Sequence, residues 1–188
     1  MIQELVLKNR SYRRFKQDIP VSRKDLEELV SLARVSPSGG NGQPLKFFLS
    51  HTPETNEKIF PHLKWAASLP DWDGPTEGEK PAAYILVLLD TSISKSPGHD
   101  AGIACQSMLL GAVEKGLGGC MLGSVERNAV KEKLNLPESL DIVLVIALGT
   151  PAEQCVVEDA RDGQVTYYRT EDQVHHVPKR PLQELMLH

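Results

Sequence analysis

A chain of 188 residues, 40% of them hydrophobic and 24% charged, has the composition of one folded domain, which we expect to span residues 1–188. The formal net charge of −4 argues against a nucleic-acid-binding surface. The opening segment MIQELVLKNR is too polar and too short for a signal peptide. The longest apolar run, Ala82 to Leu89, is far shorter than the roughly 20 residues that a membrane helix needs, so we expect no membrane partner.

The first half of the chain contains one clear helix signal. Ser22 is a plausible N-cap, with Asp25 three residues later as in a capping box. The apolar residues that follow recur at the spacing of one helix face: Leu26, Leu29, Val30 and Ala33. Pro37 and Gly39 end this helix. We then expect a short strand at 46–50, a second helix near 54–63 and a loop at 69–81.

The second half predicts buried elements. A continuous apolar run predicts a buried strand from Ala82 to Asp90. The segment from Asp100 to Lys115 is apolar nearly all round, so this helix should be central or lie in a subunit interface. Beyond it we expect a short strand at 120–122, a helix from a cap at Ser124 to Leu134, a strand at 140–148 and a possible strand at 165–169. Helices and strands mix without strict alternation, which predicts a sheet flanked by helices.

The cysteines and histidines suggest no special site. Cys105, Cys120 and Cys155 are widely spaced, no CxxC occurs, and we interpret them as reduced thiols in a cytoplasmic protein. The six histidines show no HxH, HExxH or CxxH spacing, so no metal is expected. A GxSxG nucleophile motif is also missing.

Two basic stretches could bind an anion. NRSYRRF, from Asn9 to Phe15, places three arginines beside a serine, and guanidinium forks fit pairs of phosphate oxygens. A basic solvated turn explains the same spacing and is the simpler interpretation of this motif alone. VPKRPL, from Val177 to Leu182, is either a second basic site or a solvated tail.

Two glycine-rich stretches could contact a ligand. SPSGGNGQP, residues 36–44, carries no charge, and its glycines and carboxamides suit the edge of a flat heteroaromatic ring. A self-capped turn is the alternative. GLGGCMLG, residues 116–123, is either a tight helix-to-strand turn or a ligand contact, and it lacks the GxGxxG spacing of a dinucleotide site.

Together these stretches resemble the nitroreductase family of FMN-dependent oxidoreductases. The motif R-S-x-R-x-F is matched by Arg10, Ser11, Arg13 and Phe15, and P-S-x-x-N-x-Q-P by Pro37, Ser38, Asn41, Gln43 and Pro44. GLG-x-C-x-x-G is matched by Gly116, Leu117, Gly118, Cys120 and Gly123, and the closing basic motif by Lys179, Arg180, Pro181 and Leu182. The chain departs from the family at Leu45, where many members carry an aromatic residue, and in its short 69–81 loop.

The resemblance implies an α+β, nitroreductase-like fold with a mainly antiparallel central sheet flanked by helices, in a homodimer with shared flavin sites. FMN is the implied cofactor and NAD(P)H the implied reductant. The implied phosphate and ribityl ligands are Arg10, Ser11 and Arg13, with Lys179 and Arg180 completing the charge. Pro37, Ser38 and Gly39 are implied to reach the flavin of the partner subunit, Asn41 and Gln43 to sit near its polar edge, and Met121, Leu122 and Gly123 to line the ring.

The implied activity is hydride transfer from NAD(P)H through flavin N5 to a nitroaromatic, quinone or enone-type acceptor. No protein acid or base is obligatory for this chemistry, so no catalytic residue is assigned. One alternative is a flavin-consuming or dehalogenating member of the same superfamily. Others are a flavin-binding carrier or sensor with little turnover, and a structural dimer with no ligand.

Overall fold

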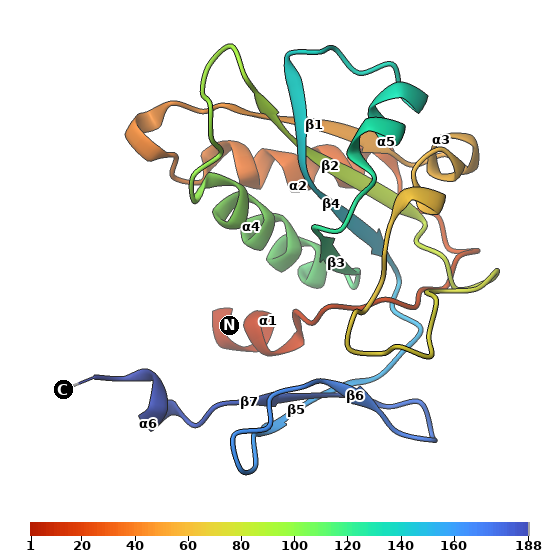
Figure 1. Ribbon diagram of the computed structural model, residues 1–188, viewed down its shortest axis with the longest axis vertical. Coiled ribbons are helices and arrows are strands. Elements are labelled where there is room, and N and C mark those ends of the chain that lie inside the picture. Colours follow the sequence, from red (N-terminus) through yellow and green to blue (C-terminus); the bar gives the residue numbers. More distant parts are fainter. Residues whose placement is uncertain (188) are drawn as a thin grey trace.

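The structure is a computed structural model that describes residues 1–187 (Figure 1). Its helices are α1 (Ile2–Lys8), α2 (Arg23–Val35), α3 (Pro53–Glu57), α4 (Asp100–Glu114), α5 (Arg127–Lys133) and α6 (Leu182–Leu185), with short 3₁₀ helices η1 (Gly39–Asn41) and η2 (Phe60–His62). Its strands are β1 (Leu45–Ser50), β2 (Ala83–Asp90), β3 (Gly118–Leu122), β4 (Leu140–Gly149), β5 (Cys155–Asp159), β6 (Tyr168–Arg169) and β7 (His175–Lys179). No helix among these residues has the length and apolar character that crossing a membrane requires.

The central sheet has four strands in the order β1-β2-β4-β3, and every pair is antiparallel. Alternate residues of β2 point to opposite faces, as the pleat of a strand requires. Ile85 and Val87 pack into a core with α2 and α4, whereas Tyr84 and Leu86 pack into a second core beneath η2 and α5. Both faces are therefore covered, and the expected α+β sheet flanked by helices is confirmed.

The helix expected after Ser22 forms as the sequence indicates. Ser22 Oγ accepts a hydrogen bond from the Asp25 backbone N–H, and Asp25 bonds back to Ser22, which completes the capping box of α2. Leu26, Leu29 and Ala33 are buried. This face packs on α4, which runs beside α2 in Figure 1. The core position of α4 fits its nearly continuous apolar sequence.

A second, three-stranded sheet was not expected. Its order is β5-β7-β6, with β5 parallel to β7, and it lies beyond α1 in the view of Figure 1. The stretch VPKRPL, interpreted as a possible solvated tail, instead begins inside β7 and ends at Leu182, the first residue of α6. The predicted strand at 165–169 is reduced to Tyr168 and Arg169.

Two helix predictions were wrong in their bounds. The helix predicted near 54–63 is divided into α3 and η2, because Pro61 has no N–H to continue the helical ladder. The helix predicted from Ser124 begins at Arg127 instead, after Glu126, whose side chain forms no capping bond. Strand β3 also begins earlier than predicted, at Gly118.

Candidate functional site

The glycines between α4 and β3 have separate roles. Gly116 has a φ of 74° and ends α4, because a side chain is disfavoured in the left-handed region. Gly119 is packed so closely that a Cβ atom would lie 2.7 Å from both the Ala147 carbonyl oxygen and Leu109 Cδ2. A Cβ on Gly123 would meet nothing within 4 Å. Glycine is therefore required at position 116 by the turn and at position 119 by close packing. Gly123 has free space beside it that a ligand could occupy.

Strand β3 ends in a cavity of about 410 Å³. It is lined by Arg13, Lys64, Trp65, Ala66, Ala67, Cys120, Met121, Leu122, Gly123 and Ser124. Four of the residues implied to contact FMN, namely Arg13, Met121, Leu122 and Gly123, thus share one cavity. Trp65 belongs to the core, where 8% of its surface is exposed, and its indole also forms part of the cavity wall.

Arg13 is the charged group of this cavity. Only 9% of its surface is exposed, and its guanidinium lies 4.9 Å from the centroid of the Tyr167 ring. Nη1 donates to the Ser11 carbonyl at 3.2 Å and lies 3.3 Å from Nε2 of His175. Residues 11–13 are held against β3, where Ser11 pairs with Gly119. The first arginine motif and the glycine-rich strand are therefore brought together by the fold.

Several donors around this position have no acceptor. Within residues 1–187, buried Arg10 Nε, Arg13 Nε and His175 Nδ1 make no hydrogen bond. Arg10 uses Nη2 to bond the Val6 carbonyl at 2.8 Å. Buried donors are costly to leave unpaired, especially on charged groups. An anion with several oxygen atoms could accept hydrogen bonds from these unpaired donors.

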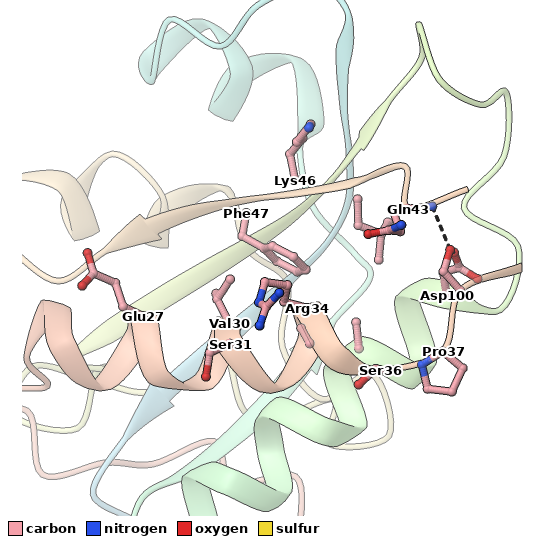
Figure 2. Close-up of a pocket in the computed structure, with 14 residues that line it drawn as sticks. Glu27, Val30, Ser31, Arg34, Ser36, Pro37, Gln43, Lys46, Phe47 and Asp100 are labelled. Atoms are coloured by element: carbon pink, nitrogen blue, oxygen red, sulfur yellow. Dashed lines mark hydrogen bonds between the residues drawn. The ribbon is translucent and has the colours of Figure 1, made fainter. Parts of the chain in front are cut away.

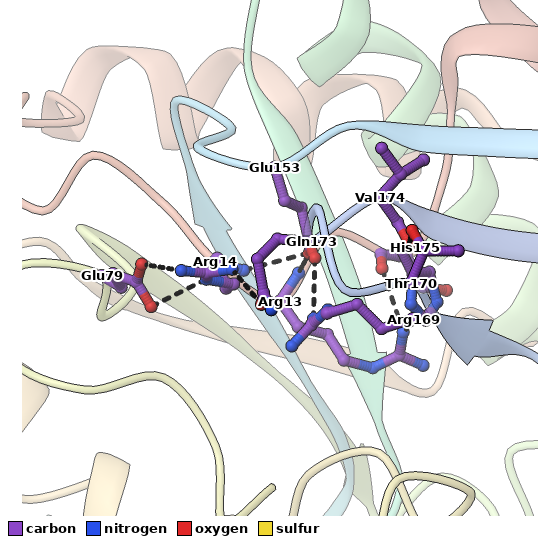
Figure 3. Close-up of polar contacts among 10 residues, drawn as sticks. Arg13, Arg14, Glu79, Glu153, Arg169, Thr170, Gln173, Val174 and His175 are labelled. Carbon is purple, nitrogen blue, oxygen red and sulfur yellow. Dashed lines mark hydrogen bonds and ion pairs between the residues drawn. The ribbon is translucent and has the colours of Figure 1, made fainter.

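The neighbouring arginine has a different task (Figure 3). Arg14 forms a two-pronged ion pair with Glu79, and its Nη1 donates to Gln173 at 3.1 Å. Glu153 accepts hydrogen bonds from the backbone N–H groups of Arg13 and Arg14. It also forms an ion pair of 2.9 Å with Arg169. Since the Glu153 side chain is only 1% exposed, this is an internal anchor that ties the second sheet to the N-terminal segment.

The 36–44 loop is anchored from another element. Asp100, the first residue of α4, accepts the Ser38 hydroxyl at 2.5 Å and the Gly39 N–H at 2.9 Å. These two bonds lower the pKa of Asp100 below its usual range. Gln43 donates from its side chain to Asn41, and both residues have positive φ, of 49° and 55°. The loop is therefore built around its own polar side chains and one buried carboxylate.

This loop lines a cavity of its own, of about 470 Å³, between α2, β1 and the start of α4 (Figure 2). Pro37, Ser38 and Gln43 line it, and the residues of the Met121 cavity do not. Gln43 and Asp100 lie at one end and Glu27 at the other (Figure 2). Within one chain, the two glycine-rich stretches thus border different cavities.

The closing basic motif is also apart from Arg13. Lys179 ends β7 and is exposed, and Arg180 pairs with Glu184 of α6 at 3.2 Å. Neither residue lines the Met121 cavity. The assignment of Lys179 and Arg180 to a cofactor phosphate therefore stays a prediction.

The three cysteines form no disulfide with one another, and burial governs their chemistry. Cys105, Cys120 and Cys155 are free, and burial is the main cause that raises the pKa of each, to about 12 for Cys105 and Cys155. Among residues 1–187, no group of three or more His, Cys, Asp or Glu could hold a metal ion.

Three residues of the site were missed in the sequence. Glu153 and His175 lie in a region with no periodic signal, and each reaches Arg13 across more than half of the chain. Asp100 was recognised as the start of a helix, but nothing local indicated that Ser38 is its partner. An acidic residue in the first turn of a helix was the only signal available for it.

Comparison with known proteins identifies the family to which the chain belongs. The chain has an α+β fold in which a cavity lies between an arginine-bearing segment and a glycine-rich strand. These are the features that the resemblance to flavin-dependent oxidoreductases implied. The nitroreductase family model matches residues 6–150, and the chain belongs to the nitroreductase family. It is accordingly an oxidoreductase, and the resemblance recognised in the sequence is confirmed.

The relatives extend over most of the chain. A protein of Archaeoglobus fulgidus named as an NADH dehydrogenase/NAD(P)H nitroreductase is 28% identical over 167 residues, which cover 85% of this chain and 90% of that protein. An iodotyrosine deiodinase of Thermotoga neapolitana is 26% identical over 167 residues, covering 80% and 89%. The crystal structure of a nitroreductase family protein from Clostridium difficile has a TM-score of 0.67 at 22% identity and covers 100% of this chain and 96% of that chain. This last likeness concerns the fold.

Proposed function

We propose that the protein binds FMN and uses NAD(P)H to reduce a nitroaromatic, quinone or enone-type acceptor. The observation that carries the proposal is the unpaired buried Nε of Arg13 in a cavity lined by Met121, Leu122 and Gly123, with a second unpaired donor on Arg10 three residues earlier in the chain. A phosphate monoester offers several anionic oxygens, and guanidinium donors bind such oxygens in pairs. The residues present therefore fit FMN, and when bound it would supply the hydride-transfer chemistry.

The chain's own residues would bind and orient. Arg10, Ser11 and Arg13 would hold the phosphate and ribityl chain, and Met121, Leu122 and Gly123 would lie along the ring. The exposed surface of Met121, 37%, leaves a side chain free to contact a flat molecule. Trp65 and Leu122 provide apolar walls that exclude water from one side. We assign no proton-transfer residue.

We further propose that the site is completed by a second copy of the chain. Pro37, Ser38, Gly39, Asn41 and Gln43 do not line the Met121 cavity of their own chain. A homodimer would bring this loop of one subunit to the cavity of the other, near the polar edge of the flavin. Ile2, Val6, Leu32, Val35 and Ile103, on α1, α2 and α4, are exposed apolar residues that a dimer interface would cover.

Cofactor binding is tested on the purified full-length protein. We expect a yellow protein, or one that becomes yellow with added FMN, that binds FMN more tightly than riboflavin or FAD. A charge-assisted hydrogen bond contributes roughly 1.5–3 kcal/mol, so loss of the phosphate should weaken binding by on the order of tenfold or more. Equal affinities for riboflavin and FMN would refute the phosphate assignment. Bound flavin that NADH and NADPH leave oxidised would favour a carrier or sensor.

The shared site is tested by subunit complementation. One chain carries Arg13→Ala and the other carries Asn41→Ala with Gln43→Ala, and the mixed dimer is isolated by two affinity tags. If each site uses residues of both chains, the mixed dimer contains one doubly altered site and one intact site, and it should bind about half the normal flavin. Uniformly weak binding at both sites would place the loop and Arg13 in one chain's site. Light scattering that shows a flavin-bound monomer would reject sharing altogether.

A dehalogenating reaction is a second candidate, favoured by the iodotyrosine deiodinase among the relatives. The same loaded protein should be assayed with a halogenated phenol and a nitroaromatic. Release of halide that exceeds nitroaromatic reduction would favour this alternative. The three free cysteines suit a reducing compartment, and we propose that the protein is cytoplasmic.

A further inference from the structure

We propose a second small-molecule site, for a neutral planar aromatic compound that carries a carbonyl or amide oxygen, in the cavity closed by Tyr84. The cavity measures about 420 Å³ and lies where the end of β1, α3, η2 and the start of β2 meet. The wall residues that the argument uses are Gln17, Asn56, Phe60, Glu77, Lys80 and Tyr84. None of these residues lines the Met121 cavity or the cavity of the 36–44 loop.

The hydroxyl of Tyr84 is the main reason for the proposal. Tyr84 lines the cavity, although only 1% of its surface is exposed. Among residues 1–187 this hydroxyl has no hydrogen-bond partner, and it is not one of the fully buried unpaired atoms, so it reaches the cavity; burial alone raises the pKa of this phenol. It therefore stays protonated and available as a donor. A tyrosine hydroxyl at the wall of an apolar cavity ordinarily has a partner, and a ligand oxygen that displaces solvent there would accept its hydrogen bond.

The wall of the cavity is held in place before any ligand binds. Four of the lining residues are prolines, whose backbone φ is fixed. Gln17 Oε1 accepts the backbone N–H groups of Gly78 at 2.8 Å and Lys80 at 3.1 Å. Asn56 donates to the Ala82 carbonyl at 2.8 Å. A preformed wall of this kind lowers the ordering cost of binding.

The lining favours a neutral aromatic ligand. Phe60 and the prolines offer flat apolar surface for a ring. The one lysine is already engaged, because Lys80 Nζ lies 2.6 Å from Glu77 and 4.9 Å from the Phe60 ring centroid. No arginine lines the cavity, so an anionic ligand would find no free guanidinium. A carbonyl oxygen can accept from Tyr84 without the desolvation cost of a buried carboxylate.

The test uses benzamide as the probe and the full-length protein saturated with FMN. Two-dimensional amide NMR spectra are recorded during titration of the wild type, Tyr84→Phe and the control Tyr168→Phe. Tyr168 donates to Glu158 on the second sheet and lies outside the cavity. Because the Tyr84 hydroxyl has no hydrogen-bond partner in the protein, its removal should leave the melting temperature nearly unchanged.

We expect wild-type binding with a dissociation constant on the order of 1 mM, with shifted amides around Asn56, Lys80 and Tyr84. Tyr84→Phe should weaken binding about fivefold or more, and Tyr168→Phe should not weaken it. NAD(P)H oxidation should be equal in all three proteins. Absence of binding, shifts confined to Met121–Gly123, or equal affinity of Tyr84→Phe would each overturn the proposal. The wild-type shift map decides the matter even if Tyr84→Phe folds poorly, and recording it again without added FMN separates failure of this site from failure of the FMN assignment.

Discussion

Nη1 of Arg13 lies 3.3 Å from Nε2 of His175, and both side chains are almost fully buried. Arginine can only donate, so Nε2 must be the acceptor and the imidazole is neutral, with its hydrogen on Nδ1. Burial first, and then the charge of Arg13, lower the pKa of His175 below its usual value. A strand outside the matched family region thereby positions the arginine of the candidate cofactor site.

This pair predicts a loss of stability on mild acidification. The unfolded chain protonates His175 near its ordinary pKa of about 6.5, whereas the folded chain resists protonation. The unfolded state therefore binds more protons as the pH falls below about 6.5, and the free energy of unfolding decreases there. We expect melting temperatures measured between about pH 7 and pH 5.5 to fall less steeply for His175→Gln than for the wild type. His176→Gln is the matched control, and equal slopes for the wild type and His175→Gln would remove His175 as the cause.

Arg13 and its neighbour Arg14 should have separable effects. Arg13→Lys keeps the charge but removes the planar fork, and we expect FMN affinity to fall by about tenfold or more. Arg14→Gln breaks the pair with Glu79 instead, so it should lower the melting temperature and leave FMN affinity within about twofold of the wild type. Flavin fluorescence titration measures the first effect and thermal unfolding the second. The assignment fails if Arg14→Gln weakens FMN as much as Arg13→Lys.

Asp100 should control the order of the 36–44 loop. Asp100→Asn removes the charge and puts an amide where two donors now point, so Ser38 or Gly39 loses its acceptor. A bond to a charged group is worth about 1.5–3 kcal/mol, and we expect faster hydrogen exchange of the loop amides, Gly39 above all. Asp18→Asn, at an exposed position, serves as the control. Unchanged exchange at residues 38–43 would mean that the loop is held by its own turns.

Two glycines predict opposite effects of the same substitution. Gly119→Ala would place a Cβ 2.7 Å from the Ala147 carbonyl oxygen, which the sheet holds in place. We expect a loss of stability of about 1–3 kcal/mol, as in other overpacked cores. Gly102→Ala, in α4 with no atom within 4 Å of its Cβ, should instead gain about 0.5–1 kcal/mol from helix propensity. Thermal or urea unfolding measures both, and equal signs would contradict the packing argument.

The sequence predicted the parts of the fold that local patterns determine. The capping box at Ser22 and Asp25 and the apolar run of β2 depend on neighbouring residues, and both formed as expected. Strands β5 and β7 were missed because their stability depends on distant partners. Sequences such as HHVPK carry no strand alternation, and the ion pair between Arg169 and Glu153 helps to fix this sheet to the rest of the chain.

The sequence motifs predicted which residues belong to the candidate site, but not how these residues contact one another. Resemblance indicated Arg13 and the stretch Met121–Gly123, and the fold places them around one cavity. The contact between Arg13 and His175 joins residues 162 positions apart, and no periodicity reports such a pair. Gln43 lines a different cavity of the same chain and Lys179 lines neither cavity, so no local pattern relates either residue to Arg13.

Cys120 should be dispensable for turnover, although it lines the Met121 cavity. A reactive thiolate needs a lowered pKa, and the sequence offered no charged neighbour of Cys120. The structure does place Arg13 near enough to favour the thiolate, but burial has the larger effect and the pKa of Cys120 is raised. The thiol therefore stays protonated and behaves as a small apolar side chain, 2% exposed.

Cys120→Ala should keep the rate of NAD(P)H-dependent nitroaromatic or quinone reduction per bound flavin within about threefold, with a stability loss of about 1 kcal/mol from the small cavity. Flavin content is measured in parallel, and Cys105→Ala, buried on α4, is the matched control for packing loss. A decrease of about a hundredfold per bound flavin in Cys120→Ala alone, which corresponds to about 2.7 kcal/mol of transition-state stabilisation, would show that the thiol takes part in the reaction.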